Sequence, residues 1–126
     1  MKTALQMVAD AKSRIREVPV EAADAAIAEA TILIDVREPD EFRQGHLPGA
    51  INMPRGLLEF QLGANPACAD ADLVAVVYCK TSGRAALAAQ TMQSMGYTNV
   101  RSISGGYDGW VAAGKPVVHP QLPDFG

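Results

Sequence analysis

Cys79 is the residue best placed for chemistry, because of what stands on either side of it. A valine-rich run, residues 73–78, precedes it and is typical of a buried parallel strand. Small and apolar residues at helical spacing follow from Ala85, and Gly96 supplies the stop. Residues 79–84 are therefore expected to form a loop between a strand and the first turn of a helix. Helix amino termini offer free N–H groups and a partial positive charge, so we expect a reactive thiolate held by backbone donors.

The rest of this loop is polar and suits an anionic ligand. Lys80 and Arg84 can attract an anion, although Lys80 is equally explained as a surface charge and Arg84 as a structural clamp. The hydroxyls of Thr81 and Ser82 either bond to sulfur or oxygen atoms of a ligand or cap the helix, and we expect one of them to be a cap. Gly83 completes the loop, whose N–H groups are expected to point inward as a nest for negative charge.

A second group of polar residues follows a neighbouring predicted strand, residues 31–36. Asp35 and Arg37 stand at the end of that strand and can reach the rim of the pocket. We expect them to form an ion pair or a loop brace rather than to act directly in catalysis. His46 stands in a predicted turn before Pro48, and we expect it to hold that turn by a hydrogen bond rather than to act as a base.

The second cysteine, Cys68, lies beside Asn65 in a predicted loop. A second-thiol role, passing sulfur or forming a disulfide with Cys79, is possible there but not the expectation. The two cysteines and two histidines lack metal-ligand spacing, so we predict no metal site. We predict no cofactor either. The apolar residues 57–60 either form a wall that excludes water from the site or belong to the ordinary core.

Length and composition set the broad class. A chain of 126 residues, with 48% hydrophobic and 20% charged residues, is expected to fold as one domain. The formal net charge of −3 gives no support for nucleic-acid binding. No apolar run is long enough for a membrane span, and no secretory signal is apparent at the start. With two cysteines only, we expect a reducing, cytoplasmic location.

The order of predicted elements indicates an α/β fold, with a parallel sheet and helices on both faces. The predicted helices cover residues 2–15, 20–30, 39–44, 85–95 and 107–113, and the predicted strands cover residues 31–36, 50–53, 73–78 and 99–103. The apolar stripe of the first helix consists of Leu5, Val8, the stem of Lys12 and Ile15. We expect this stripe to pack on the main body, whereas residues 55–72 give no clear pattern.

Four motifs, in this order, resemble those of rhodanese domains. They are Leu33-Ile34-Asp35-Val36-Arg37-Glu38, Gly45-His46-Leu47-Pro48-Gly49-Ala50-Ile51-Asn52, Tyr78-Cys79-Lys80-Thr81-Ser82-Gly83-Arg84 and Gly105-Gly106-Tyr107-Asp108-Gly109-Trp110. The resemblance implies a rhodanese-like five-stranded parallel sheet with helices on both faces. It divides the chain into an N-terminal helical extension (1–17), a rhodanese-like domain (18–117) and an extended C-terminal tail (118–126).

The resemblance also implies sulfurtransferase activity of the thiosulfate type, with Cys79 as the active cysteine. The thiolate would attack the outer sulfur of a small anionic donor such as thiosulfate, sulfite would leave, and a persulfide would remain. Cyanide, a second thiol or an acceptor protein would then remove the sulfur. One departure stands in the loop: the commoner family pattern has glycine three residues after the cysteine, where this chain has Ser82.

Three other functions remain open from the sequence. A phosphatase or arsenate reductase on the same scaffold is the rival enzyme, but protein-tyrosine-type phosphatases carry one more residue between cysteine and arginine than the four found here. A sulfur-carrier or regulatory binding module with little turnover is the second. Redox sensing through sulfenylation of Cys79 is the third.

Overall fold

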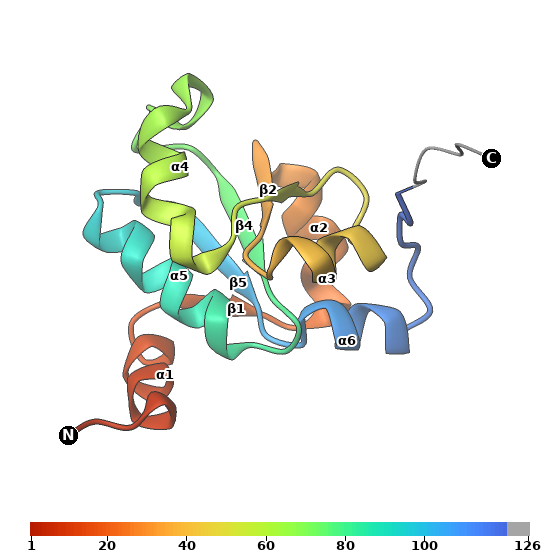
Figure 1. Ribbon diagram of the computed structural model, residues 1–126, viewed down its shortest axis with the longest axis horizontal. Helices are drawn as coiled ribbons and strands as arrows, with labels where there is room; N and C mark the ends of the chain where they lie inside the picture. The colour runs from red at the N-terminus through yellow and green to blue at the C-terminus, as the bar shows by residue number, and fades with distance from the viewer. Residues whose placement is uncertain (121–126) are drawn as a thin grey trace.

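Five parallel strands form the centre of the molecule, in the order β1-β5-β4-β2-β3 (Figure 1). The computed structural model describes residues 1–120, to which all structural statements refer. The strands are β1 (Arg16–Val18), β2 (Ile32–Asp35), β3 (Ile51–Asn52), β4 (Ala75–Tyr78) and β5 (Val100–Ile103). The predicted five-stranded parallel sheet is thereby confirmed. Residues 121–126, part of the predicted extended tail, lie outside the described residues.

Strand β4 is the central strand, and its sequence explains why. It pairs with β2 on one side and β5 on the other, with Val77 opposite Ile34 and Ser102. All four of its residues are buried, which its run of apolar side chains, two of them β-branched valines, allows. Cys79 follows directly, so the loop after β4 begins at the carboxyl edge of the sheet, where open α/β sheets bind their ligands.

Helices cover both faces of the sheet (Figure 1). They are α1 (Ala4–Lys12), α2 (Val20–Glu29), α3 (Pro39–Gln44), α4 (Leu58–Ala64), α5 (Gly83–Ser94) and α6 (Gly106–Ala112), with short 3₁₀ turns at Arg55–Leu57 and Pro66–Cys68. Alternate strand residues face two separate apolar clusters. Val77 and Cys79 lie in the cluster formed with α4 and α5, whereas Val76 and Tyr78 lie in the cluster formed with α2 and α6.

The amino-terminal region differs from the prediction in two respects. Helix α1 ends at Lys12, and the next residues form β1, an edge strand that the sequence did not predict. The strand begins at Arg16, so the sheet takes in the end of the predicted extension. The predicted apolar stripe is also wrong at its start, since Leu5 is 82% exposed whereas Ala11 is fully buried.

Helix α3 and the following turn lie close to α6. The capping box of Glu38 and Glu41 starts α3, with Pro39 in its first turn as predicted. Gly45 ends the helix where a side chain has no room, because an added Cβ would lie 2.5 Å from the hydroxyl oxygen of Tyr107. This close approach holds α3 against α6 at the carboxyl edge of the sheet.

Candidate active site

The loop after β4 is held from outside by the first turn of α6. The carbonyl oxygen of Cys79 accepts a hydrogen bond from the N–H of Tyr107 at 2.8 Å, and that of Lys80 accepts one from the N–H of Asp108 at 3.0 Å. In a trans peptide the N–H points opposite to the C=O of the same peptide unit. The N–H groups of Lys80 and Thr81 are therefore directed away from α6, toward the inside of the loop.

Gly106 makes this arrangement possible. It adopts a φ of +59°, and an added Cβ would lie 2.6 Å from the carbonyl oxygens of both Cys79 and Lys80 and against that of Thr81. Only glycine allows α6 to approach the loop backbone this closely. The three carbonyl groups consequently face α6 together.

The backbone N–H groups of residues 80–85 make up the inner side of the loop. In the described part of the chain, none of them donates a hydrogen bond to a backbone or side-chain oxygen. The N–H groups of residues 81–85 belong to the first turn of α5 or come directly before it. The partial positive charge of the helix end therefore adds to the partial charge of each of these N–H groups. Successive unpaired N–H groups of this kind form an anion-binding nest. The geometry therefore offers a cradle for a small negative charge beside Cys79.

Cys79 itself is at the bottom of the site and not at the surface. The residue is 1% exposed and belongs to the apolar cluster that includes Val36, Leu58 and Ala85. A ligand reaches its sulfur only if the covering side chains shift. Of the predicted apolar segment, Leu58 is buried in this cluster, whereas Leu57 and Phe60 are exposed.

Arg84 is joined to α3 by a bidentate ion pair. Its Nη1 and Nη2 donate to Oε1 and Oε2 of Glu41 at 2.7 and 3.1 Å. The hydrogen bonds from Arg84 are the main cause that lowers the pKa of Glu41 from 4.5 to about 2. In turn, the pKa of Arg84 is raised, chiefly by Glu41 and to a smaller extent by the charges of Cys79 and Glu38. The sequence did not predict this contact between Glu41 and the loop, which joins residues 43 positions apart in the chain.

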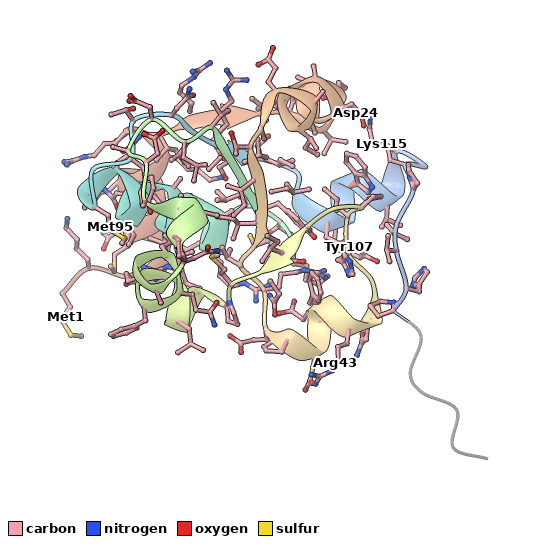
Figure 2. All side chains as sticks on the ribbon, turned by 90° about the horizontal axis from the view of Figure 1, so that it is seen from above. Met1, Asp24, Arg43, Met95, Tyr107 and Lys115 are labelled. Carbon is pink, nitrogen blue, oxygen red and sulfur yellow. The ribbon has the colours of Figure 1, made fainter. Side chains whose placement is uncertain are left out.

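Lys80 lies on the outer side of the loop, half exposed. Its ammonium donates to Asp108 at 2.8 Å, which ties the loop to α6 a second time. Both residues line a cavity of about 250 Å³ together with Tyr107, which Figure 2 labels, with two residues of α3 and with Arg37, which follows β2. The complete lining consists of Arg37, Glu41, Gln44, Lys80, Tyr107 and Asp108.

Asp35 and Arg37 form a buried ion pair next to this cavity. Arg37 Nη2 donates to Asp35 Oδ2 at 2.8 Å and to the carbonyl oxygen of Gly45 at 2.6 Å. Its guanidinium lies 4.3 Å from the ring centroid of Tyr107. The pair therefore connects the end of β2, the end of α3 and the start of α6. These are the elements that surround the loop.

His46 and Ser82 are the remaining predicted site residues. His46 stacks on Phe42 with ring centroids 3.8 Å apart, its Nδ1 lies 3.2 Å from the carbonyl oxygen of Phe42, and its backbone bridges to Val118. This places His46 in the turn after α3, in a bracing position. The capping prediction is wrong: Ser82 is the N-cap residue of α5, but its hydroxyl caps no N–H group and instead accepts a hydrogen bond from Lys12.

Cys68 is a free, buried thiol in the core. Burial raises its pKa, and its carbonyl oxygen accepts a hydrogen bond from the hydroxyl of Tyr97. Within residues 1–120, no three or more histidine, cysteine, aspartate or glutamate side chains are grouped so that they could hold a metal ion. Over the same residues, no helix has the length and apolarity needed to cross a membrane.

The loop, its strand and its helix fit a known protein family. The family model described as the rhodanese-like domain matches residues 19–113. The chain belongs to the rhodanese-like family. This match covers most of the chain and includes the loop from Cys79 to Arg84.

Individual relatives agree with this assignment. The protein is 32% identical, over 76% of its own length and 86% of the relative's, to a sulfurtransferase of Allochromatium vinosum. It is 35% identical to human thiosulfate:glutathione sulfurtransferase, over 63% of its length and 77% of the relative's. A solved Rhodopseudomonas palustris structure, a protein of unknown function named as a possible tyrosine phosphatase, superposes with a TM-score of 0.82 at 31% identity, covering 94% and 96% of the two chains. The named relatives support sulfur transfer as the general activity.

Proposed function

We propose that this rhodanese-like protein moves a sulfane sulfur from thiosulfate, or a related anionic donor, to a thiol or cyanide through a persulfide on Cys79. The observation that carries the proposal is the row of unpaired N–H groups at residues 80–85, in the loop that starts at Cys79. Preorganised donors of this kind stabilise charge that develops in a transition state. The names of the A. vinosum and human relatives support sulfur transfer as the chemistry of such a site.

In the first half-reaction the Cys79 thiolate attacks the outer sulfur of thiosulfate. A bond forms between the two sulfurs, the bond within thiosulfate breaks, and its electron pair leaves with sulfite. The charge that the thiolate carried is then on the terminal sulfur of the persulfide. In this proposal the N–H groups of residues 80–85 are the donors that stabilise the persulfide and the transition state before it.

In the second half-reaction an acceptor attacks the terminal sulfur. Cyanide carbon or a thiolate sulfur forms the new bond, the persulfide bond breaks, and its electron pair returns to Cys79 as the thiolate. The products are thiocyanate or a new persulfide on the acceptor, which includes the case of a protein thiol. Neither half-reaction requires a metal, a cofactor or a general base.

The polar residues around the loop have supporting roles in this proposal. Thr81, Ser82 and Gly83 supply inward N–H groups, and Arg84 fixes the start of α5 through Glu41. Lys80 attracts the anionic donor to the mouth of the site. Asp35, Arg37 and His46 keep the surrounding turns in place and do not touch the reacting sulfur.

The name of the R. palustris structure makes phosphatase activity the alternative to test. Four residues separate Cys79 from Arg84, which makes a tight cradle better suited to one sulfur atom than to a tetrahedral phosphate. Arg84 is also engaged by both oxygens of Glu41, and a phosphate would have to displace this carboxylate.

The test is turnover of thiosulfate and cyanide by the native chain and by Cys79→Ser. We expect thiocyanate from the native protein and loss of at least about a thousandfold in the variant, since the nucleophile carries both half-reactions. A matched variant, Cys68→Ala, is expected to turn over at the native rate. Equal rates for the native chain and Cys79→Ser, or Cys79-dependent hydrolysis of an aryl phosphate without thiocyanate formation, would reject the proposal. Sulfur loading without turnover would assign the protein to the carrier class.

A further inference from the structure

Helix α1 packs beside the start of α5 (Figure 1), and it also contacts the loop through one side chain. An added Cβ on Gly83 would lie 3.5 Å from Cγ2 of Val8, so the middle of α1 packs on the first residue of α5. One turn farther along α1, the Nζ of Lys12 donates to Oγ of Ser82 at 2.7 Å. The helix thus reaches Ser82, whose backbone N–H group is part of the nest.

Lys12 is held in this position from a second side. Oε2 of Glu17 lies 3.8 Å from its Nζ, is buried and has no hydrogen-bond partner within residues 1–120. By strand register Glu17 is opposite Ser102, which is opposite Val77, so these side chains share the face of the sheet to which Cys79 also belongs. The hydroxyl of Ser102 is likewise fully buried and without a partner in the described chain.

Lys12 thus joins the loop to β1, through Ser82 on one side and Glu17 on the other. Ser102 of β5 is the strand neighbour of Glu17. A buried carboxylate oxygen without a hydrogen bond, 3.8 Å from the Lys12 ammonium, is costly in a fold that needs α1 only for packing. Lys2, at the other end of α1, shows the ordinary alternative, since it pairs with Asp10 in solvent.

We propose that Lys12 is a positioning residue for sulfur transfer, acting through Ser82; this inference rests on the proposed function. A hydroxyl has one hydrogen to donate and two lone pairs to accept. Because Oγ of Ser82 already accepts from the Lys12 ammonium, its hydrogen is available to a sulfur or oxygen atom of the donor, and the charge polarises the O–H bond. Lys12 also adds a positive charge next to a nest that must hold an anion.

The proposal explains the serine three residues after Cys79. With glycine there, Lys12 would have no acceptor in the loop. With Ser82, the amino-terminal helix becomes part of the site, and the hydroxyl becomes an additional donor beside the N–H groups. The substrate class that benefits is a donor with anionic oxygens, such as thiosulfate.

The experiment is a double-mutant cycle of Lys12→Met and Ser82→Ala, with kcat/KM for thiosulfate as the readout and Lys2→Met as the matched control. We expect each single variant to lose about tenfold, a change of about 1.4 kcal/mol in the barrier. The double variant should lose no more than the worse single variant, because both remove the same interaction. Lys12→Arg, which keeps charge and donors, should recover most of the rate, and Lys2→Met should match the native chain.

Other results would overturn the inference. Losses that multiply in the double variant, or full activity of Lys12→Met, would show that Lys12 does not act through Ser82. Thermal unfolding of each variant separates a positioning role from loss of α1 packing. The inference would also be rejected if the activity loss follows the melting temperature and Lys12→Arg does not recover the activity. Failure of the proposed function is distinguishable, since the native chain and Lys2→Met would then both form no thiocyanate.

Discussion

The ion pair between Glu41 and Arg84 gives a quantitative prediction about the loop. The change tested is Glu41→Gln, which keeps an oxygen for the N–H of Glu38 but removes the charge that Arg84 binds. A fall in the pKa from 4.5 to about 2 corresponds to about 3 kcal/mol of stabilisation of the folded state. Because 31% of the Glu41 side chain is exposed, solvent screening reduces the expected loss to about 1–2 kcal/mol.

The pH dependence of this stabilisation has a definite sign. The folded state lowers the pKa of Glu41, so the contribution is complete above the ordinary value of 4.5 and is lost as the pH falls toward about 2. The native chain should therefore be more stable than Glu41→Gln at pH 7, by about 1–2 kcal/mol, and the difference should shrink at pH 3.

Urea unfolding at pH 7, 4 and 3 measures the difference directly. The matched control is Glu59→Gln, which removes the carboxylate of an exposed ion pair with Arg55 and is expected to cost less than about 0.5 kcal/mol. A difference for Glu41→Gln that is as small as the control, or that is constant from pH 7 to pH 3, would refute the assignment of Glu41 as the ionised partner of Arg84.

Three further variants test the frame around the loop. Asp35→Asn leaves the buried Arg37 guanidinium without its carboxylate and should lower the free energy of unfolding by about 3–5 kcal/mol, measured in urea; a loss below about 1 kcal/mol would contradict the buried pair. Gly106→Ala places a Cβ against three carbonyl oxygens and should lower the free energy of unfolding by more than about 2 kcal/mol and abolish thiocyanate formation. Its control, Gly114→Ala, has a φ of +74° and open space around the added Cβ, so it should lower stability but keep turnover. Cys68→Ala should lose about 1 kcal/mol by thermal unfolding without any change in kcat, and a loss of turnover would point to a second thiol in the reaction.

The central part of the fold could be predicted because its signals are local. The valines before Cys79 and the alanines after Arg84 give a strand, a loop and a helix within one stretch of sequence. Strand β1 could not be found in the same way, since it has three residues and two of them are charged. It is a strand only because it pairs with β5, a contact between residues far apart in the chain.

The site could be predicted in part for the same reason. The position of the thiol and the direction of the helix follow from neighbouring residues. The partners of the loop do not: Glu41 is 43 residues from Arg84, and Lys12 is 70 residues from Ser82. The sequence shows Ser82 in a position where a cap is common, and only the fold shows that its hydroxyl turns to α1 instead.

The most direct measurement of the central claim is peptide mass spectrometry after brief exposure of the native chain to thiosulfate, without an acceptor. The account predicts one additional sulfur atom on the peptide that contains Cys79, none on the peptide with Cys68, and its removal by cyanide. A native chain that gains no sulfur, or gains it on Cys68, would contradict the claim that the nest holds a charged sulfur at Cys79.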